Sequence, residues 1–406
     1  MSNSVLGSVT LGYQLVWNAW RQRCATRLLV EPHLSGAVDA QHLLHTLHEL
    51  WPAGLDAQIL VARTPALLSD LLDHAPAQAL WLEIPDTWLG DALLAGRIRK
   101  ARQRGVRLLW RGDTGQPPAA ELQDLFHKTL RSITPHEALA ALRAALQRTH
   151  DGGGSHNNWT SPILPGALYE GLASQALVEH ALDHQAVWGV AGWPTEEMLY
   201  SYRYKQIQPG RQLLLDLVHA IDADESLEAL EHRMGNEPLL TYRFLRYANS
   251  AALSLRTEIG SVRQGLMTLG YSRLRAWLME QMPHANSDAN LQPIRASIVL
   301  RARIMERLAD AGIEDDLRRE VFLCGIFSQV DLLLGETLGA ALHRLPLPGR
   351  VASAILGQTG PYAPWLETAS ALESGNTKVI RDVCRAHDLE ADEVNRALLR
   401  SLTAPA

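Results

Sequence analysis

The spacing of apolar residues changes once along this chain of 406 residues, and the change constrains the fold more than any other feature. Short strand-like runs alternate with helical patterns up to about residue 195, whereas from about residue 206 onward only helical patterns occur. The candidate strands are 57–62, 79–84 and 106–110, and the candidate helices are 38–51, 65–74, 90–104, 134–149 and 167–182. Strands that are regularly followed by helices pair in parallel through right-handed crossovers. The sequence therefore predicts an α/β sheet or barrel over residues 1–198, followed by an all-α domain over residues 199–406.

Composition and cysteine usage exclude several classes of protein. The formal net charge of −6 gives no general attraction for nucleic acid. Cys24, Cys324 and Cys384 are too widely separated for a disulfide framework or a CxxC metal or redox motif. No apolar run is uninterrupted enough to predict a signal peptide or a membrane span. The sequence predicts a cytoplasmic protein that acts without membrane or nucleic acid, and it leaves the oligomeric state open.

The segment 237–278 predicts a compact helical module. One face of its first helix carries an apolar residue at every fourth position: Leu240, Phe244 and Ala248. Asn249 and Ser250 then interrupt the helix with small polar groups. Ser261 and Gln264 have the spacing of a capping box, which begins the next helix. We expect Asn249 and Ser250 to have a structural role, because polar groups at a helix end satisfy free backbone groups.

This order of a proline-started helix, an Asn-Ser-Ala ending and an arginine-rich helix resembles the HDOD family. HDOD domains are similar to HD-domain phosphohydrolases that have lost their metal site, so the resemblance implies signalling or scaffolding. The apolar segment 321–335 predicts a central buried helix, in which Ser328 and Gln329 stand where HD enzymes carry His-Asp. Neutral side chains cannot replace those ligands, and Asp331 alone makes no metal site. The resemblance therefore implies no metal in this half.

The stretch 345–399 resembles the helical extension of proteins in which an HDOD domain follows an EAL domain. This directs attention to the first half, where LGYQLVWN resembles the opening strand of EAL enzymes. Gln14 stands there in place of the family's glutamate, and an amide lacks the anionic oxygen that a hard cation prefers. Arg63 occupies the region of a metal-binding asparagine. A cation at that position would oppose metal binding directly.

The remaining EAL-like positions are partly retained. Glu83 in WLEIPD and Glu170 in ALYEGLA match acidic positions of the family. The segment LLWRGD stands where active enzymes carry two consecutive aspartates, so Trp110 and its neighbour leave only Asp113 as a displaced acid. Two-metal phosphodiester hydrolysis needs several converging carboxylates, and two are too few. The resemblance implies a degenerate EAL-type (β/α) barrel without metal or cofactor, and the shortness of the domain leaves open that the barrel is incomplete. Trp110 and Trp188 are expected to point into the former substrate region.

Two functions remain open at this stage. The first is a catalytically inactive bacterial signal-transduction protein that binds other signalling proteins in a pathway related to cyclic di-GMP, with control of motility or surface behaviour as its output. The second is a residual cyclic-dinucleotide-binding protein or weak phosphodiesterase that uses Glu83 and Glu170. The neutral residues Gln14, Ser328 and Gln329 favour the first function.

Overall fold

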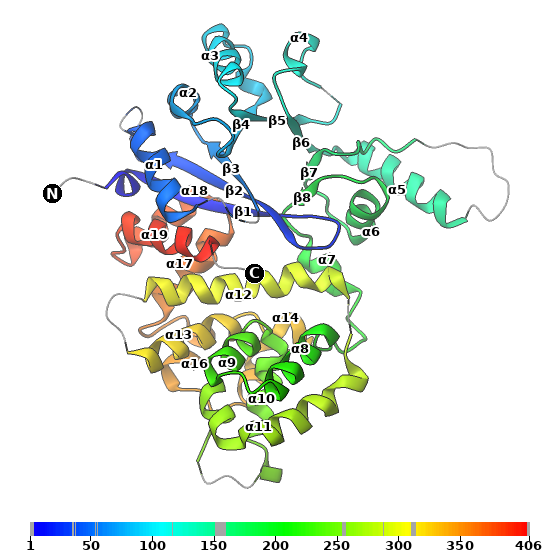
Figure 1. Cartoon of the computed structure of the whole chain (residues 1–406), viewed down its shortest axis with the longest axis vertical. Helices are drawn as coiled ribbons and strands as arrows, with labels where there is room; N and C mark the ends of the chain where they lie inside the picture. Colours follow the sequence, from blue (N-terminus) through cyan, green and yellow to red (C-terminus); the bar gives the residue numbers. More distant parts are fainter. Residues whose placement is uncertain are drawn as a thin grey trace. The chain divides into compact units, whose positions relative to one another are not determined.

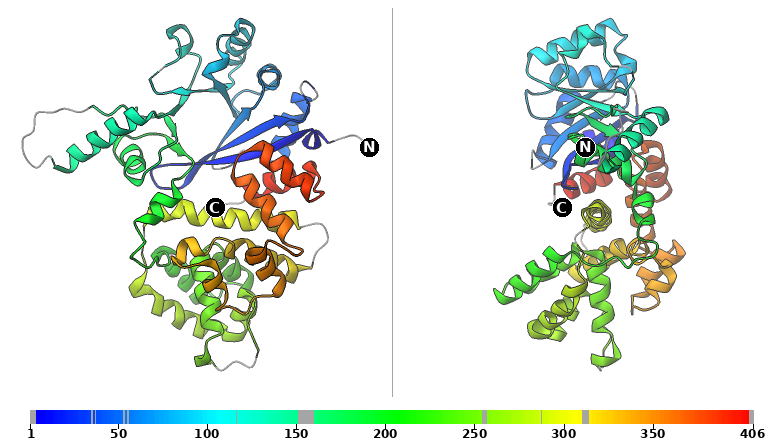
Figure 2. Two further views of the ribbon diagram at one scale, coloured as in Figure 1. Left: turned by 180° about the vertical axis from the view of Figure 1, so that it is seen from behind. Right: turned by 90° about the vertical axis from the view of Figure 1, so that its right-hand side faces the viewer.

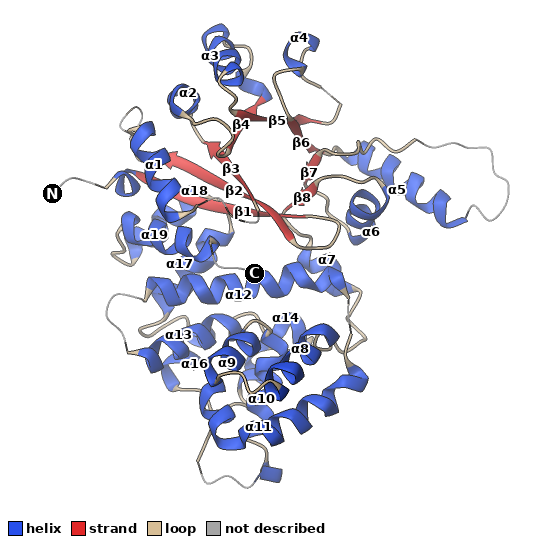
Figure 3. Ribbon diagram, in the orientation of Figure 1, coloured by secondary structure: helices blue, strands red, loops and turns tan. Residues whose placement is uncertain are grey.

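The computed structural model describes residues 4–34, 36, 38–52, 54, 56–115, 117–150, 160–253, 257–286, 288–309 and 314–403. Two compact units make up the chain. The first contains the residues up to Glu197 together with Ala371–Thr403, and the second contains Met198–Ser370. The first unit is an α/β barrel and the second is built from helices, so the predicted fold class is confirmed (Figures 1 and 3).

Eight strands close into a barrel in chain order, from β1 round to β8. They are β1 (Val9–Trp17), β2 (Arg23–Pro32), β3 (Ala57–Ala62), β4 (Trp81–Pro85), β5 (Arg107–Asp113), β6 (Lys128–Ser132), β7 (Leu168–Glu170) and β8 (Gly189–Ala191). β1 runs antiparallel to β2 and β8, and every other neighbouring pair is parallel. Because the ring is closed, the barrel is complete, and the shortness of the domain does not come from a missing strand.

Helices follow most of the parallel strands, as the alternating pattern predicted. They are α1 (Ala40–Leu50), α2 (Pro65–His74), α3 (Ala92–Gln103), α4 (Ala120–Gln123), α5 (Pro135–His150), α6 (Gln175–Glu179) and α7 (Thr195–Tyr200). Local capping starts them: the Thr64 side chain accepts from the Leu67 backbone and Pro65 begins α2. The helix expected over 167–182 is wrong, because its first residues form β7.

The barrel is filled by apolar side chains that alternate inward along the strands. The central group includes Ile59, Leu109, Leu130 and Leu168, all of them fully buried. Residues two positions further along the parallel strands face the same interior at the carboxyl end of the barrel. The register of the strands therefore determines which polar residues face the interior at the carboxyl end of the barrel, its mouth.

The C-terminal helices belong to the barrel unit, whereas the sequence analysis assigned the whole of 199–406 to the helical domain. α17 (Ala363–Glu373) leads into α18 (Thr377–Ala386) and α19 (Ala391–Leu402), and the last two pack on β1 and on the short helix η1 (Val5–Ser8), as the red and blue segments show (Figure 2). Gly12 permits the close approach, since a Cβ there would lie 3.2 Å from Cδ1 of Ile380. The physical reason is amphipathicity: both helices need an apolar surface to cover their buried faces.

The second unit consists of helices of 4 to 20 residues around an apolar core. They are α8 (Arg211–Asp222), α9 (Leu227–Gly235), α10 (Pro238–Ala248), α11 (Val262–Gln281), α12 (Gln292–Leu308), α13 (Asp315–Phe327), α14 (Asp331–Leu334), α15 (Leu338–Leu342) and α16 (Gly349–Gly357). The single helix expected over 321–335 is wrong, because α13 ends at Phe327 and α14 begins at Asp331. The Ser328 hydroxyl donates to the Gly325 carbonyl at 2.7 Å at this break. Within the described residues, no helix is both long and apolar enough to cross a membrane.

Asn395 ties α19 to the start of the barrel, and its removal should destabilise the first unit. Its amide donates to the Leu6 and Val9 carbonyls at 2.8 and 2.9 Å and accepts from the Leu11 backbone at 3.1 Å. Asn395→Ala leaves these buried backbone groups without partners, so we expect a loss of at least about 2 kcal/mol in unfolding free energy. Chemical unfolding followed by tryptophan fluorescence measures it. The exposed Arg400→Ala on the same helix is the control, and equal stability of the two variants would contradict the expectation.

Candidate functional site

Six polar side chains face inward at the carboxyl end of the barrel. They are Gln14 from β1, Arg27 from β2, Glu83 from β4, Arg111 from β5, Ser132 from β6 and Glu170 from β7. The strand register brings them together: Gln14 pairs directly with Arg27 across the antiparallel β1–β2 ladder, and Ser132 pairs with Glu170. We call this group the mouth cluster.

Arg27 and Glu83 form the centre of the mouth cluster and are both buried, with exposed fractions of 4% and 1%. Arg27 forms a bidentate ion pair with Glu83, in which Nε donates to Oε2 at 2.8 Å and Nη2 donates to Oε1 at 2.7 Å. Its Nη1 also donates to Gln14 Oε1 and, at 3.1 Å, to Glu170 Oε2. Burial lowers the pKa of Arg27, but its attraction to Glu83 and Glu170 outweighs burial and raises that pKa overall.

Glu170 is held by three donors. Besides Arg27, the Arg111 guanidinium binds Oε1 with Nε at 3.0 Å and Nη2 at 2.8 Å, and the Ser132 hydroxyl donates to the same oxygen at 2.7 Å. Burial raises the pKa of Glu170, but the two guanidinium groups and the hydroxyl outweigh it, so the net shift of its pKa is downward. Glu170 is therefore a fixed carboxylate between two fixed cations.

The mouth cluster does not fit a divalent metal. Both oxygens of Glu83 accept from Arg27, and both oxygens of Glu170 accept from arginines, so the positions where a cation would bind are already taken by positive groups. Among the described residues, no group of three or more His, Cys, Asp or Glu side chains could hold a metal ion. Hydrolysis through two metals requires such a group of ligands.

The structure brings together only some of the residues that the sequence singled out. Gln14, Glu83 and Glu170 converge, whereas Arg63 follows β3 as an exposed residue and Asp113 is exposed at the end of β5. The mouth cluster is made without either of them.

The expectation that Trp110 and Trp188 fill the substrate region is wrong. Trp110 alternates with the inward-facing Leu109, so it is buried outside the barrel wall, where its Nε1 donates to Asp86 at 2.9 Å. Trp188 precedes β8 at the opposite end of the barrel, where it packs on Trp81 with ring centroids 5.6 Å apart. Neither side chain reaches the mouth.

Sequence reasoning missed Arg27 and Arg111, the two cations of the site. A signal for Arg27 was present, because it is the one charged residue between Cys24 and Val30 of an otherwise apolar and threonine-containing strand. A charge in a buried strand needs an opposite charge nearby. Position 111 was considered only because an arginine stands there where EAL enzymes carry an aspartate, and its own role was not predicted.

In the helical unit, the sequence singled out the pair Asn249 and Ser250 and the segment from Ser328 to Asp331. The Asn249 amide donates to the Leu245 and Ile259 carbonyls at 2.8 and 2.9 Å and accepts from the Ile259 backbone at 2.8 Å. It thus links the end of α10 to the following connector. The Ser250 hydroxyl oxygen is buried and has no hydrogen-bond partner among the described atoms.

Ser328 and Gln329, which stand where the HD resemblance would place His-Asp, lie at the turn between α13 and α14. Arg301 Nη1 lies 3.4 Å from the Ser328 hydroxyl oxygen, so a cation stands beside this position as well. Gln329 lies in the same turn, and its carbonyl accepts from the Leu332 backbone at 3.2 Å. Burial raises the pKa of Asp331, which begins α14.

Comparison with known proteins agrees with the two predicted domains. The model of the HDOD domain family matches residues 211–339, which lie in the second unit, so the predicted HDOD domain is confirmed. The EAL-type fold predicted for the first unit agrees with its closed eight-stranded barrel.

Two curated proteins are similar in sequence to part of the chain. The uncharacterised protein YuxH of Bacillus subtilis is 26% identical over 167 residues, which are 40% of this chain and 40% of that protein. The cyclic di-GMP phosphodiesterase CdgJ of Vibrio cholerae serotype O1 is 23% identical over 172 residues, 42% of this chain and 40% of that protein. The aligned part thus spans well under half of either relative.

Among solved structures, a calcium and cy-diGMP complex of BlrP1 from Klebsiella pneumoniae matches 48% of this chain and 57% of its own, with 10% identity and a TM-score of 0.31.

Breaking the central ion pair from one side should cost more than removing both partners. Arg27→Met leaves Glu83 buried without its cation, and such a loss costs about 3–5 kcal/mol of unfolding free energy. Arg27→Met combined with Glu83→Leu removes both charges and should regain much of that loss. A double-mutant cycle by urea unfolding measures the coupling. The exposed Arg63→Met is the control, for which about 0.5 kcal/mol or less is expected. Additive losses in the double variant would mean that the pair is not coupled.

Glu170 should make the stability of the barrel depend on pH in the acid range. Its pKa is lowered in the folded state, so its contribution is fully present above the ordinary value of about 4.3 and is lost as the pH falls through the lowered pKa. Glu170→Gln should therefore be less stable than the unmodified protein at pH 7, and the gap should shrink below about pH 4. Melting temperatures from pH 7 to 3 test this. A gap of constant size over that range would exclude the ionised Glu170 as its source.

Proposed function

We propose that this chain is a catalytically inactive signal-transduction protein of a bacterial cyclic di-GMP pathway. In this proposal it acts in the cytoplasm by binding other signalling proteins, and the barrel and the HDOD domain are interaction modules. Control of motility or surface behaviour is the proposed output.

The observation that carries the proposal of inactivity is the buried Arg27. A guanidinium held by Glu83, Glu170 and Gln14 supplies a positive charge, as a metal would, but it cannot polarise and deprotonate a bound water. A metal that took over these carboxylates would leave the buried Arg27 guanidinium without its partners, which is strongly unfavourable. The cluster is therefore stable as a structural core and poorly suited to gaining a metal.

The link to cyclic di-GMP is supported by a relative and by the type of fold. CdgJ is named as a cyclic di-GMP phosphodiesterase, although the alignment covers 40% of it. The role as a binding platform rests on the resemblance to HDOD domains, which are regarded as signalling modules.

A second candidate function is residual binding of a cyclic dinucleotide at the barrel mouth. The Arg111 side chain favours it, because 37% of its surface is exposed and its guanidinium can donate hydrogen bonds to a phosphate in place of Glu170. Binding without turnover is compatible with the proposed inactivity.

The purified full-length protein should not hydrolyse cyclic di-GMP with Mg²⁺ or Mn²⁺. Product formation is measured by chromatography beside an active EAL phosphodiesterase. If a trace of product forms, its amount should be the same for the unmodified protein and for Glu83→Gln, because we expect it to come from a contaminating enzyme. Turnover that needs a divalent cation and disappears in Glu83→Gln would refute the proposal.

A further inference from the structure

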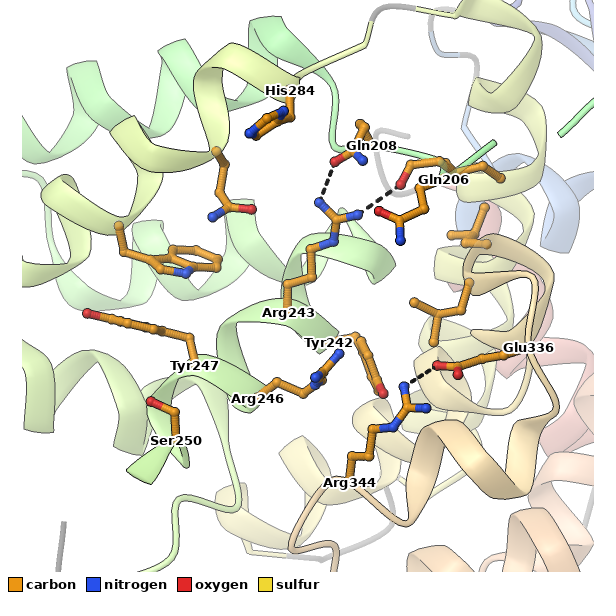
Figure 4. A pocket seen from close by; sticks show the side chains of 15 residues that line it. Gln206, Gln208, Tyr242, Arg243, Arg246, Tyr247, Ser250, His284, Glu336 and Arg344 are labelled. Carbon is orange, nitrogen blue, oxygen red and sulfur yellow. Dashed lines mark hydrogen bonds and ion pairs between the residues drawn. The ribbon is translucent and has the colours of Figure 1, made fainter. Parts of the chain in front are cut away.

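A pocket of about 660 Å³ lies within the helical unit, separate from the barrel mouth. It is formed by the connector before α8, by α10, by the end of α11 and by the segment from α14 to α15. Figure 4 shows that polar side chains from these elements surround it. Its volume lies in the range of about 300–1,000 Å³ that is usual for small-molecule sites.

The lining of the pocket is positively charged. Arg243, Arg246 and Arg344 contribute three guanidinium groups, and Glu336 is the carboxylate in the lining. Glu336 pairs with Arg344 at 2.7 Å, so of the three arginines it neutralises Arg344 alone. Two positive charges remain for a ligand.

Arg243 is fixed in position without being neutralised. Its Nη1 donates to Gln208 Oε1 at 2.6 Å and its Nη2 donates to the Ile207 carbonyl at 2.9 Å, and both acceptors are uncharged. The buried Glu237 before α10 pairs with Arg295 at 3.3 Å, and it attracts Arg243 electrostatically. Arg246 lies with its guanidinium 5.8 Å from the centre of the Tyr242 ring, and the side chain is exposed. The preorganised Arg243 and the accessible Arg246 suit an anionic group.

One wall of the pocket is aromatic and rigid. Tyr247 stacks on Trp277 with ring centroids 5.6 Å apart and an interplanar angle of 19°. Phe244 packs edge-on against the same indole at 5.5 Å, so the wall is supported from the core. The buried Ser250 hydroxyl, which has no partner among the described atoms, lines the pocket on this side. A buried polar group without a partner is a position where a ligand can supply the missing hydrogen bond.

From this arrangement we infer that the pocket of the HDOD domain binds a nucleotide, with the phosphate on Arg243 and Arg246 and the flat base beside Tyr247. Amide groups of Gln206 and Gln281 line the same space and can hydrogen-bond to the edge of a base. An inorganic anion would use the guanidinium groups but would leave the aromatic wall and most of the volume unused. The inference is independent of what the barrel mouth binds.

Calorimetric titration of the full-length protein tests the inference with GMP, AMP, cyclic di-GMP and inorganic phosphate as separate probes. At least one nucleotide should bind, and at least about tenfold more tightly than inorganic phosphate, because the base adds contacts. Arg246→Ala should weaken that binding about tenfold or more. Tyr247→Ala should weaken nucleotide binding and leave phosphate binding unchanged.

Two control variants locate the binding. Arg273→Ala removes an exposed arginine of α11 outside the pocket and should leave the affinity unchanged. Arg111→Ala alters the barrel mouth and reports any binding there, so affinity that is lost in Arg246→Ala and kept in Arg111→Ala assigns the ligand to the helical unit. Three outcomes would each overturn the inference. The first is that none of the three nucleotides binds, and the second is that phosphate binds as tightly as they do. The third is binding that Arg111→Ala abolishes and Arg246→Ala does not. Circular dichroism of Arg246→Ala verifies that the helical unit remains folded.

Discussion

The buried pair of Arg27 and Glu83 determines what the barrel can do. A closed barrel of eight strands has an interior filled by side chains, so each inward position is either apolar or needs a partner. Here the polar positions satisfy one another: two carboxylates, two guanidinium groups, an amide and a hydroxyl form one connected network. The charge that a metal enzyme leaves for its ion is balanced within the protein.

The same principle appears in the helical unit, with a different result. At the turn after α13, Arg301 lies beside Ser328, and the two side chains share a hydrogen bond. In the neighbouring pocket, by contrast, Arg243 is held by neutral acceptors only and keeps its charge available. An arginine whose hydrogen-bond acceptors are carboxylates is neutralised within the protein. An arginine whose acceptors are uncharged can still attract an anionic ligand.

Much of the fold could be predicted from the sequence because the apolar pattern carries it. The runs at 57–62, 79–84 and 106–110 are strands, and Gln14, Glu83 and Glu170 meet as their motifs indicated. Strand β6 was missed because Lys128 and Arg131 interrupt its apolar pattern. The break after Phe327 was missed because a segment that is apolar all round gives no sign of where the backbone turns. Arg27 was missed because a comparison of motifs reports which ligands are lost and says nothing about which new residue balances the remaining charge.

The docking of α18 and α19 on the barrel makes its unit discontinuous in sequence, with Met198–Ser370 inserted between two parts of one fold. The eight strands are synthesised before the helices that cover β1, so the nascent barrel has an apolar surface uncovered until α18 and α19 follow. The inserted unit can fold during that interval. The order of synthesis thus separates the eight strands from the helices that cover β1 by the whole length of the inserted unit.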